Sequence, residues 1–401
     1  MNERDFYHHV KEGEFAYIGY PLQGINALYP HGAEVQERIA SKFVKELTDR
    51  GYLKVTLPQS VPEAFVNHLH RKGLFVAKNE KREFFLSGSM EMQATTLAKT
   101  MVNSHKDLPL RLFSRSIVYR ECDPSSLIKG PEYTSYELNS YFSTRTEAEN
   151  EMANMENLAK KWLTDLNIPS IAVRSKPDNN SPVVLYAYFP FSESFGSIYW
   201  GGVVDKKYSD IVDFNFHGSD NKKHRPSQYN GGFTSRILAA YLANNSDQHG
   251  FVLQPSVSSA EVLVPRNMGC QIENLPFSII KARADGRESL ISKFGSMGIP
   301  VLLSNGKHEV NVTQRTSMAS SWVNPQDLIQ TTRQYLHSAE TTRSTSPIPV
   351  QVIESDDEVI SPAKNIVYVA PISSVERLQK LDLKTIGYVD QENVYMVLRK
   401  Y

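Results

Sequence analysis

Residues 111–137 read RLFSRSIVYRECDPSSLIKGPEYTSYE, and this stretch decides how the rest of the chain is interpreted. Its pattern predicts a strand ending in Tyr-Arg, a polar loop bounded by two prolines, and a return strand. Because side chains alternate along a strand, Lys129, Tyr133 and Glu137 should share one face, with Arg120 facing them. Two cations, a ring and a carboxylate suit a nucleotide triphosphate, although a solvated sheet-edge hairpin can have the same composition.

Composition and length place the chain among ordinary globular proteins. Its 401 residues are 40% hydrophobic and 22% charged, which indicates two or three domains with ample core. Lysine plus arginine and aspartate plus glutamate number 44 each, so no global basic field indicates nucleic-acid binding, although a local patch is allowed. Cys122 and Cys270 form no CxxC motif, which argues against a disulfide framework or a structural zinc site. The charged start MNERDFYHHV and the lack of a long apolar run predict a soluble cytoplasmic protein with no membrane partner.

Two helices are expected on either side of the hairpin. The first ends at Gly51 and leads into a strand over residues 52–57 that stops at Pro58. Its apolar face comprises Val35, Ile39, Phe43, Val44 and Leu47. The second spans residues 144–167, and the spacing of its large apolar residues predicts core packing rather than a cofactor site. These residues are Met152, Met155, Leu158 and Trp162.

Residues 82–102 predict a short apolar strand, a Ser-Gly-Ser turn, and a helix that begins near Met90 or Glu91. Ser89 is a plausible helix cap, and Glu91 lies where a helix N-terminus favours negative charge. Helix capping is therefore the simplest interpretation of both residues from the local sequence.

Residues 171–217 alternate as strands do, in the segments SIAVRSK, VVLYAYF, SIYWGGVV and IVDFNF, and predict an antiparallel sheet that continues the hairpin. Asp205 follows Gly201 and Gly202 and is either a carboxylate near a close backbone approach or a turn residue. Further on, a glycine pair leads into a helix with Arg236 in its first turn, where an arginine can meet an anion or remain solvated.

The C-terminal third reads as a separate unit. We expect a domain boundary near Pro255, mixed α/β structure over residues 276–345, and an exposed linker at ETTRSTSPIPV. The last fifty or so residues alternate strand, helix and strand in NIVYVAP, SVERLQKL and VYMVLRKY.

Three separated pieces resemble, in order, the motifs of the class II aminoacyl-tRNA synthetases. Residues 51–58 resemble motif 1, Tyr119-Arg120 with residues 129–137 resembles motif 2, and residues 232–236 resemble motif 3. Further segments are similar to the prolyl branch of subclass IIa: PLQGINALYPHGAEVQERI, the loop from Ser87 to Glu91 with Ser89 in place of threonine, YFSTRTEAENEM, and DQHGFVLQPSVSSAEVLVP. The likeness covers most of residues 17–265, and the chain resembles a divergent paralogue of prolyl-tRNA synthetase.

The resemblance implies an α+β fold with an antiparallel six- or seven-stranded sheet flanked by helices, followed by a smaller α/β domain of the anticodon-binding type. It implies a catalytic domain over residues 1–255, a truncated anticodon-binding-like domain over 256–345, and a C-terminal extension over 346–401. It also implies a homodimer formed through motif 1, with ATP and Mg²⁺ as cofactors, in a ligase of protein biosynthesis.

The resemblance further assigns roles to individual residues. Arg120 and Arg236 are the expected catalytic residues. The expected ATP ligands are Arg120 at the α-phosphate, Lys129 and Arg236 at the β- and γ-phosphates, Tyr133 at the adenine, and Gln228. The expected amino-acid ligands are Ser89, Glu91, Ser135, Glu137, Asn139 and Asp205, and Glu137 is also a candidate Mg²⁺ ligand.

The sequence departs from the prolyl family at several of these positions. Cys122 stands where an acid should meet the adenine amino group, unless the loop shifts by one residue to use Glu121, and Lys129 replaces an arginine. Ser135 stands where the prolyl enzymes have tryptophan, and Asn139 stands where they have histidine. Asp205 falls near the position of a histidine that the prolyl enzymes carry in a downstream Gly-rich strand. These changes predict a substrate amino acid that is larger than proline or that carries an amine in its side chain.

The anticodon-type domain departs as well, because only NMGCQIENLP separates EVLVP from FSIIKARADG, which predicts loss of the first helix. The leading expectation is an enzyme that forms an aminoacyl adenylate and transfers the acyl group to tRNA, a carrier protein or a small molecule. The alternative is a non-catalytic, synthetase-like dimeric subunit with a regulatory or nucleic-acid-binding role.

Overall fold

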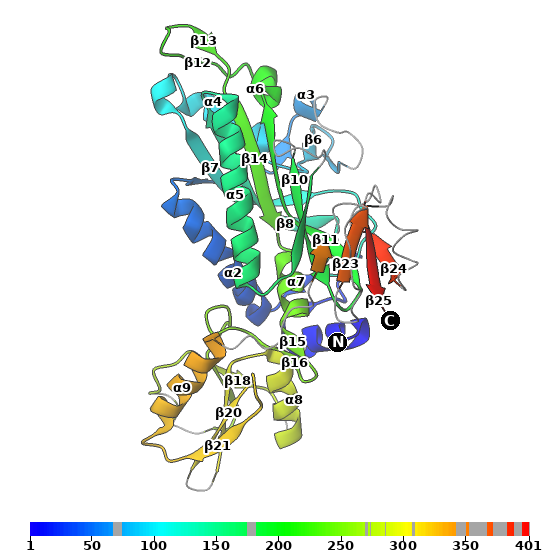
Figure 1. Cartoon of the computed structure of the whole chain (residues 1–401), viewed down its shortest axis with the longest axis vertical. Coiled ribbons are helices and arrows are strands. Elements are labelled where there is room, and N and C mark those ends of the chain that lie inside the picture. Colours follow the sequence, from blue (N-terminus) through cyan, green and yellow to red (C-terminus); the bar gives the residue numbers. More distant parts are fainter. Residues whose placement is uncertain are drawn as a thin grey trace.

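The computed structural model describes residues 1–66, 74–174, 182–268, 272, 274–284, 286–306 and 309–341, together with four strands between 350 and 400. Within these ranges the chain forms an upper body around a large sheet, a lower body around a smaller sheet, and a C-terminal sheet beside the upper body (Figure 1). Helix α1 (Glu3–Glu12) lies where the upper and lower bodies meet (Figure 1).

The upper body is organised by a seven-stranded sheet in the described part of the chain. Its order is β3 (Leu53–Val55), β7 (Leu110–Tyr119), β8 (Glu132–Phe142), β14 (Ser227–Thr234), β11 (Ser194–Asp205), β10 (Val183–Phe189) and β9 (Ser170–Arg174). Neighbouring strands are antiparallel except β3 and β7, which are parallel. The predicted α+β fold with an antiparallel core sheet is therefore confirmed.

Helices α2 (Pro30–Asp49) and α5 (Arg145–Asp165) cover one face of this sheet, and α7 (Ile237–Asn244) follows β14 at its lower end (Figure 1). The core beneath them is aromatic: Phe233 stacks on Tyr136 with ring centroids 4.4 Å apart and contacts Trp162 at 4.7 Å. The predicted apolar face of α2 is buried except for the half-buried Val44, and the four predicted core residues of α5 are buried. Hydrophobic spacing identified both helices correctly.

The opposite face of the sheet packs on α4 (Glu91–Met101), where Ala98 meets Leu110, Leu112 and Tyr141. Several short elements complete the described part of the upper body. They are β1 (Ala16–Tyr17), β2 (Ala27–Leu28), β4 (Ser60–Val61), α3 (Glu63–Val66), β5 (Val76–Lys78), β6 (Glu83–Leu86), a 3₁₀ turn (His105–Asp107), α6 (Lys207–Ile211), β12 (Phe216–His217) and β13 (Lys223–His224). Because side chains alternate along β8, the residues on the α4 side include Tyr133, Ser135 and Glu137, so the predicted site residues of β8 share this face.

The lower body has a five-stranded sheet with its own core. Its order is β18 (Ile279–Ala282), β17 (Val262–Pro265), β19 (Val301–Asn305), β20 (Val310–Gln314) and β21 (Ser320–Val323), with helices α8 (Arg287–Met297) and α9 (Leu328–Thr341). The described residues between β17 and β18 contain no α-helix, and the loss of the first helix of this domain stays a prediction. The division at residues 255 and 345 remains a prediction.

Buried polar contacts join the two bodies through α1, α2, α8 and the hairpin of β15 (Ser246–Asp247) and β16 (Gly250–Phe251). Arg315 has no exposed surface and donates from Nη1 and Nη2 to the two carboxylate oxygens of Asp247 at 2.8 and 2.7 Å. His31, at the start of α2, contacts the carbonyl oxygen of Met297 at 3.0 Å. Lys293 pairs with Glu14 at 2.7 Å.

Some expected elements differ. The N-cap residue of α4 is Met90, and its side chain makes no capping hydrogen bond. Ser89, one residue earlier, is therefore not the cap. The strand expected over 52–57 is limited to β3, and the segment IVDFNF continues from α6 and joins a strand only at Phe216. Of the expected C-terminal elements, NIVYVAP and VYMVLRKY contain β23 (Val367–Pro371) and β25 (Tyr395–Lys400), whereas SVERLQKL lies outside the described residues.

The C-terminal strands form one sheet in the order β22 (Val350–Val352), β23, β25 and β24 (Leu383–Tyr388). This sheet contacts the large sheet through β22 on β9 and β24 on β11 (Figure 1). In the described residues, no helix is both long and apolar enough to cross a membrane.

Candidate active site

A pocket of about 590 Å³ opens on the α4 side of the large sheet. It is bordered by the loop before α4, the loop between β7 and β8, and strands β8, β14, β11 and β10. Among its lining residues are most of the predicted site residues: Ser89, Glu91, Arg120, Lys129, Tyr133, Ser135, Glu137 and Arg236. Residues separated by more than a hundred positions in sequence therefore meet around one cavity.

The β7–β8 hairpin sets the order of these side chains. Its register pairs Val118 with Tyr133 and Ser114 with Glu137, and Arg120 follows directly after β7. Lys129, however, lies in the loop rather than on the return strand, so that part of the prediction is wrong. Pro131 has no N–H for a strand ladder, and the Lys129 N–H instead donates to Ser125 O at 2.7 Å within the loop.

The guanidinium of Arg120 is held by the protein at Nε, while its terminal nitrogens face the pocket. Its Nε donates to Gly88 O at 2.8 Å, and this bond joins the hairpin to the loop before α4. The side chain is exposed and lines the pocket, so its terminal nitrogens can reach an anion there. Beside it, Glu121 and Cys122 both line the pocket, and neither of these two candidates for the adenine amino group is removed by the geometry.

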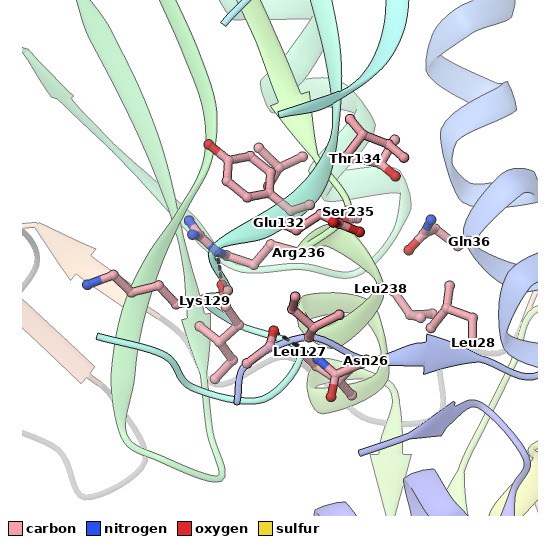
Figure 2. Close-up of a pocket in the computed structure, with 17 residues that line it drawn as sticks. Asn26, Leu28, Gln36, Leu127, Lys129, Glu132, Thr134, Ser235, Arg236 and Leu238 are labelled. Carbon is pink, nitrogen blue, oxygen red and sulfur yellow. Dashed lines mark hydrogen bonds between the residues drawn. The ribbon is translucent and has the colours of Figure 1, made fainter. Parts of the chain in front are cut away.

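Arg236 joins three segments at the start of α7. Its Nε donates to Ile128 O in the β7–β8 loop, a bond drawn in Figure 2, and its Nη1 donates to Ser197 O and to Ser197 Oγ on β11. Burial lowers the pKa of Arg236. Much of this guanidinium therefore holds the loop and the strand together, and Nη2 carries any further contact.

A smaller pocket of about 170 Å³ lies beside the first, with Lys129, Tyr133 and Arg236 lining both (Figure 2). The segment Gly24–Leu28 forms its other side, across from the β7–β8 loop and the first turn of α7. A Cβ atom on Gly130 would lie 2.2 Å from Gly24 O, so the two backbones approach as closely as glycine allows. Tyr7 Oη also donates to Ser126 O at 2.8 Å, and the N-terminal segment thus fixes the loop conformation.

Two carboxylates lie deep in the larger pocket. Glu137 Oε2 accepts from the Met90 N–H at 2.8 Å, and burial together with nearby Glu91 holds the pKa of Glu137 well above its usual range. Glu91 Oε2 is buried and has no hydrogen-bond partner among the described residues. Two buried carboxylates whose negative charge is balanced by few hydrogen-bond donors favour the binding of a cation.

Three predicted residues lie outside the pocket lining. Gln228 is fully buried against α4, where Thr95 Oγ1 donates to its Oε1 at 3.3 Å. Asp205 ends β11 with φ 48°, accepts from Ser227 Oγ at 2.8 Å and lies 3.8 Å from Arg145, which is the behaviour of a turn residue. Gln228 and Asp205 thus make packing and pairing contacts within the protein, and their roles as ligands stay predictions.

Asn139, the third of these residues, lies directly behind Glu137 on the same face of β8. Its cross-strand neighbour is Asn230 on β14, and Asn230 does line the pocket. The two amides form a buried polar floor at the end of the cavity away from Tyr133.

A family model described as the tRNA synthetase class II core domain (G, H, P, S and T) matches residues 75–245. This interval contains the β7–β8 hairpin, α4, both buried carboxylates and Arg236. Among curated proteins, the chain is 25% identical over 274 residues to a proline–tRNA ligase of Saccharolobus islandicus, covering 64% of this chain and 57% of the relative. It is 24% identical over 282 residues to that of Methanosphaera stadtmanae, covering 66% of this chain and 60% of the relative. The chain thus spans less than two thirds of the length of these relatives.

The structure itself resembles solved prolyl-tRNA synthetases. That of Giardia lamblia in complex with prolyl-adenylate matches with a TM-score of 0.78 at 15% identity, covering 99% of this chain and 97% of that chain. That of Cryptosporidium parvum, complexed with halofuginone and AMPPNP, matches with a TM-score of 0.77 at the same identity. By sequence and by fold, the chain therefore resembles the prolyl-tRNA synthetases and is divergent from them in sequence.

In this synthetase-like core, sequence reasoning missed the wall opposite β8. Trp200 on β11 pairs in register with Gly232 and lines the pocket together with Val184 and Tyr186 of β10. An indole ring therefore enters from β11, while the ring position on β8 is occupied by Ser135. The alternation in SIYWGG shows that the tryptophan lies on one face of a strand, but it does not tell which face. Only the pairing of β11 with β14 determines that it faces the pocket.

The residues present fit ATP better than they fit a metal of their own. The described residues contain no group of three or more potential metal ligands. Mg²⁺ in nucleotide sites is held by phosphates and one or two carboxylates. Glu137 Oε2 accepts the Met90 N–H, and the role of Glu137 as a Mg²⁺ ligand stays a prediction.

Proposed function

We propose that this protein activates an amino acid with ATP, forms an aminoacyl adenylate and transfers the aminoacyl group to an acceptor. The observation that carries the proposal is the convergence, in one pocket, of Arg120 and Arg236, the ring of Tyr133, and the carboxylates Glu91 and Glu137. Such a set offers an anion site, a stacking surface and a cation site, and an adenylate-forming reaction needs all three.

On the nucleotide side, the adenine stacks on Tyr133 at the mouth of the hairpin. The carboxylate of the amino acid attacks the α-phosphorus of ATP, the new P–O bond forms, and pyrophosphate leaves with the bonding electrons. Arg120 stabilises the negative charge on the α-phosphate in the transition state. Lys129, which makes no ion pair within the described residues, and Nη2 of Arg236 hold the β- and γ-phosphates. Mg²⁺ bound to these phosphates would neutralise part of their charge.

On the amino-acid side, the α-ammonium is held by Glu91 and Glu137. Glu91 Oε2 lacks a donor among the described residues, and a substrate ammonium supplies one. The amino-acid carboxylate then points toward Arg120, and the side chain extends along the sheet floor beneath Trp200.

For the acceptor we favour tRNA over a carrier protein or a small molecule, as in the proline–tRNA ligases that the chain resembles. The lower body has a pocket of about 990 Å³ lined by Arg266, Arg283 and Arg287, with Trp322 54% exposed beside them. Arginines next to an exposed ring suit single-stranded RNA. A soluble protein with this activity is expected in the cytoplasm.

A homodimer is supported by the motif 1 side of the molecule. Strand β3 is an edge strand of the large sheet, and its Leu53 is 51% exposed. Ile117 on β7 and Tyr29 before α2 are also exposed. Exposed apolar side chains beside a sheet edge are typical of a covered interface.

The non-catalytic alternative is favoured by one observation. Arg236 uses Nε and Nη1 on protein oxygens, so the phosphate-binding capacity expected of it is reduced. A scaffold protein requires only this structural role. The two functions differ in their dependence on Arg120, because its exposed guanidinium has no structural bond beyond the one to Gly88 in the described residues.

The deciding experiment is ATP–pyrophosphate exchange across the standard amino acids, with and without bulk tRNA. Arg120→Ala should lower exchange by about 10²- to 10³-fold, the range seen when one transition-state donor is removed. Arg145→Ala is the matched control, because Arg145 is an exposed arginine that pairs with Glu149 on α5 outside the pocket. Absence of exchange with every amino acid would leave the non-catalytic subunit as the better description.

A further inference from the structure

The floor of the amino-acid end of the pocket is made of two buried amides, three of whose polar atoms lack a hydrogen bond within the described residues. Asn139 and Asn230 are each 2% exposed and are directly opposed across β8 and β14. Within the described residues, Asn139 Oδ1 and both Asn230 Oδ1 and Asn230 Nδ2 are buried without a hydrogen bond. Buried amide groups are nearly always satisfied in folded proteins, so these atoms call for a partner other than the described residues.

The position of the two amides identifies which part of the substrate reaches them. Along one face of β8 the order is Tyr133, Ser135, Glu137 and Asn139, with about 7 Å between alternate residues. If the adenine lies at Tyr133 and the ammonium at Glu137, the amino-acid side chain is the part that continues toward Asn139. Gly232, the cross-strand partner of Glu137, leaves space above the floor at this point.

The unpartnered atoms comprise two acceptor oxygens and one amide nitrogen that donates. A primary carboxamide presents two N–H donors and one carbonyl acceptor, and it satisfies all three atoms together. A hydroxyl group has one donor and leaves one oxygen unpaired, while an ammonium group has no acceptor for Asn230 Nδ2. An apolar side chain, including the ring of proline, leaves all of them unpaired.

We propose that the substrate of this site is an amino acid with a primary carboxamide side chain, of asparagine or glutamine type, bound by Asn139 and Asn230. The proposal rests on the proposed function for the position of the ammonium and the nucleotide. It deepens that function by naming the substrate class. Trp200 forms the wall beside the side chain, and Ser135 leaves the floor free of a second ring.

The test measures binding and turnover separately on the full-length protein. Isothermal titration calorimetry with glutamine, asparagine, glutamate, methionine, leucine, serine, lysine and proline reports binding without chemistry, and ATP–pyrophosphate exchange with the same panel reports activation. A carboxamide amino acid should exceed its apolar counterpart by at least about 100-fold in either assay, because a site built to hydrogen-bond a substrate rejects analogues that leave its groups unpaired.

Asn230→Leu should reverse this order toward leucine or methionine, because it replaces an unpaired amide with an apolar group of similar size. Asn139→Leu provides the same test if Asn230→Leu does not fold. A strong preference for proline, leucine or methionine overturns the inference and leaves the proposed function intact, and so does a preference for glutamate, serine or lysine. Carboxamide binding without exchange supports the inference and contradicts the proposed function. Failure of every amino acid in both assays overturns both.

Discussion

The stability of the junction between the two bodies should depend on the protonation of His31. Its ring is 4% exposed and lies between Ser259 Oγ and Met297 O. Since a carbonyl oxygen can only accept, Nε2 carries the proton and Nδ1 accepts from the Ser259 hydroxyl in the neutral ring. Burial lowers the pKa of His31 from 6.5 to about 4, while Glu14 and Lys293 act on it in opposite directions.

The sign of the effect follows from the proton count. Between pH 4 and pH 6.5 the unfolded chain binds a proton at His31 and the folded chain does not, so folding is favoured above this window and loses stability as the pH falls through it. The full difference of pKa corresponds to about 3.4 kcal/mol, and about 2 kcal/mol of it is lost by about pH 5.

The assay is chemical denaturation at about pH 7.5 and about pH 5, comparing the parent chain with His31→Gln. Glutamine keeps one donor and one acceptor but does not titrate, so the variant should lose about 2 kcal/mol less between the two pH values than the parent chain. His217→Gln is the control, because His217 is exposed on β12. Equal losses in the parent and in His31→Gln would refute the reasoning.

Two further predictions concern contacts that the fold buries. Burial raises the pKa of Asp247, but its bonds to Arg315 outweigh that effect and keep the pKa low. Arg315→Met removes this cation and should reduce the free energy of unfolding by about 3–5 kcal/mol in denaturation curves. A loss below about 1 kcal/mol would show that the pair is dispensable. Gly232→Ala should distort the join between β8 and β14, because Gly232 has φ 154° and a Cβ there would lie 2.2 Å from Tyr136 O. Circular dichroism and melting temperature measure this loss, and an unchanged melting curve would contradict it.

The sequence predicted the elements in which one face is buried and the other is not. The spacing of Val35, Ile39 and Phe43 identified α2, because burial against a sheet repeats every three or four residues along a helix. The alternation in residues 111–137 identified the β7–β8 hairpin, because every second side chain of a strand lies on the same face of the sheet. Both are local consequences of a single apolar surface, so a single segment of sequence contains enough information.

Lys129 could not be placed in this way. Its position depends on Gly24, more than a hundred residues earlier, which packs against Gly130 and Pro131 and holds the end of the hairpin as a loop. Asp205 and Gln228 were assigned to the site by the family resemblance. In the fold, Arg145 and Ser227 contact Asp205, and Thr95 contacts Gln228. The protein partners of these side chains could not be predicted locally, because they come from other parts of the fold.

The same reasoning explains why the amino-acid site was the hardest part to predict. Ser135 and Asn139 were interpreted along one strand as the loss of a ring and of a histidine, which predicted a larger or amine-bearing amino acid as substrate. Across strands, the ring reappears as Trp200 on β11, and the amide gains a neighbour in Asn230 on β14. A substrate pocket on an antiparallel sheet is specified by residues that are adjacent in register, so substitutions on one strand acquire their meaning from those on the next. Interpreted in this way, the departures from the prolyl pattern agree with the proposed carboxamide substrate.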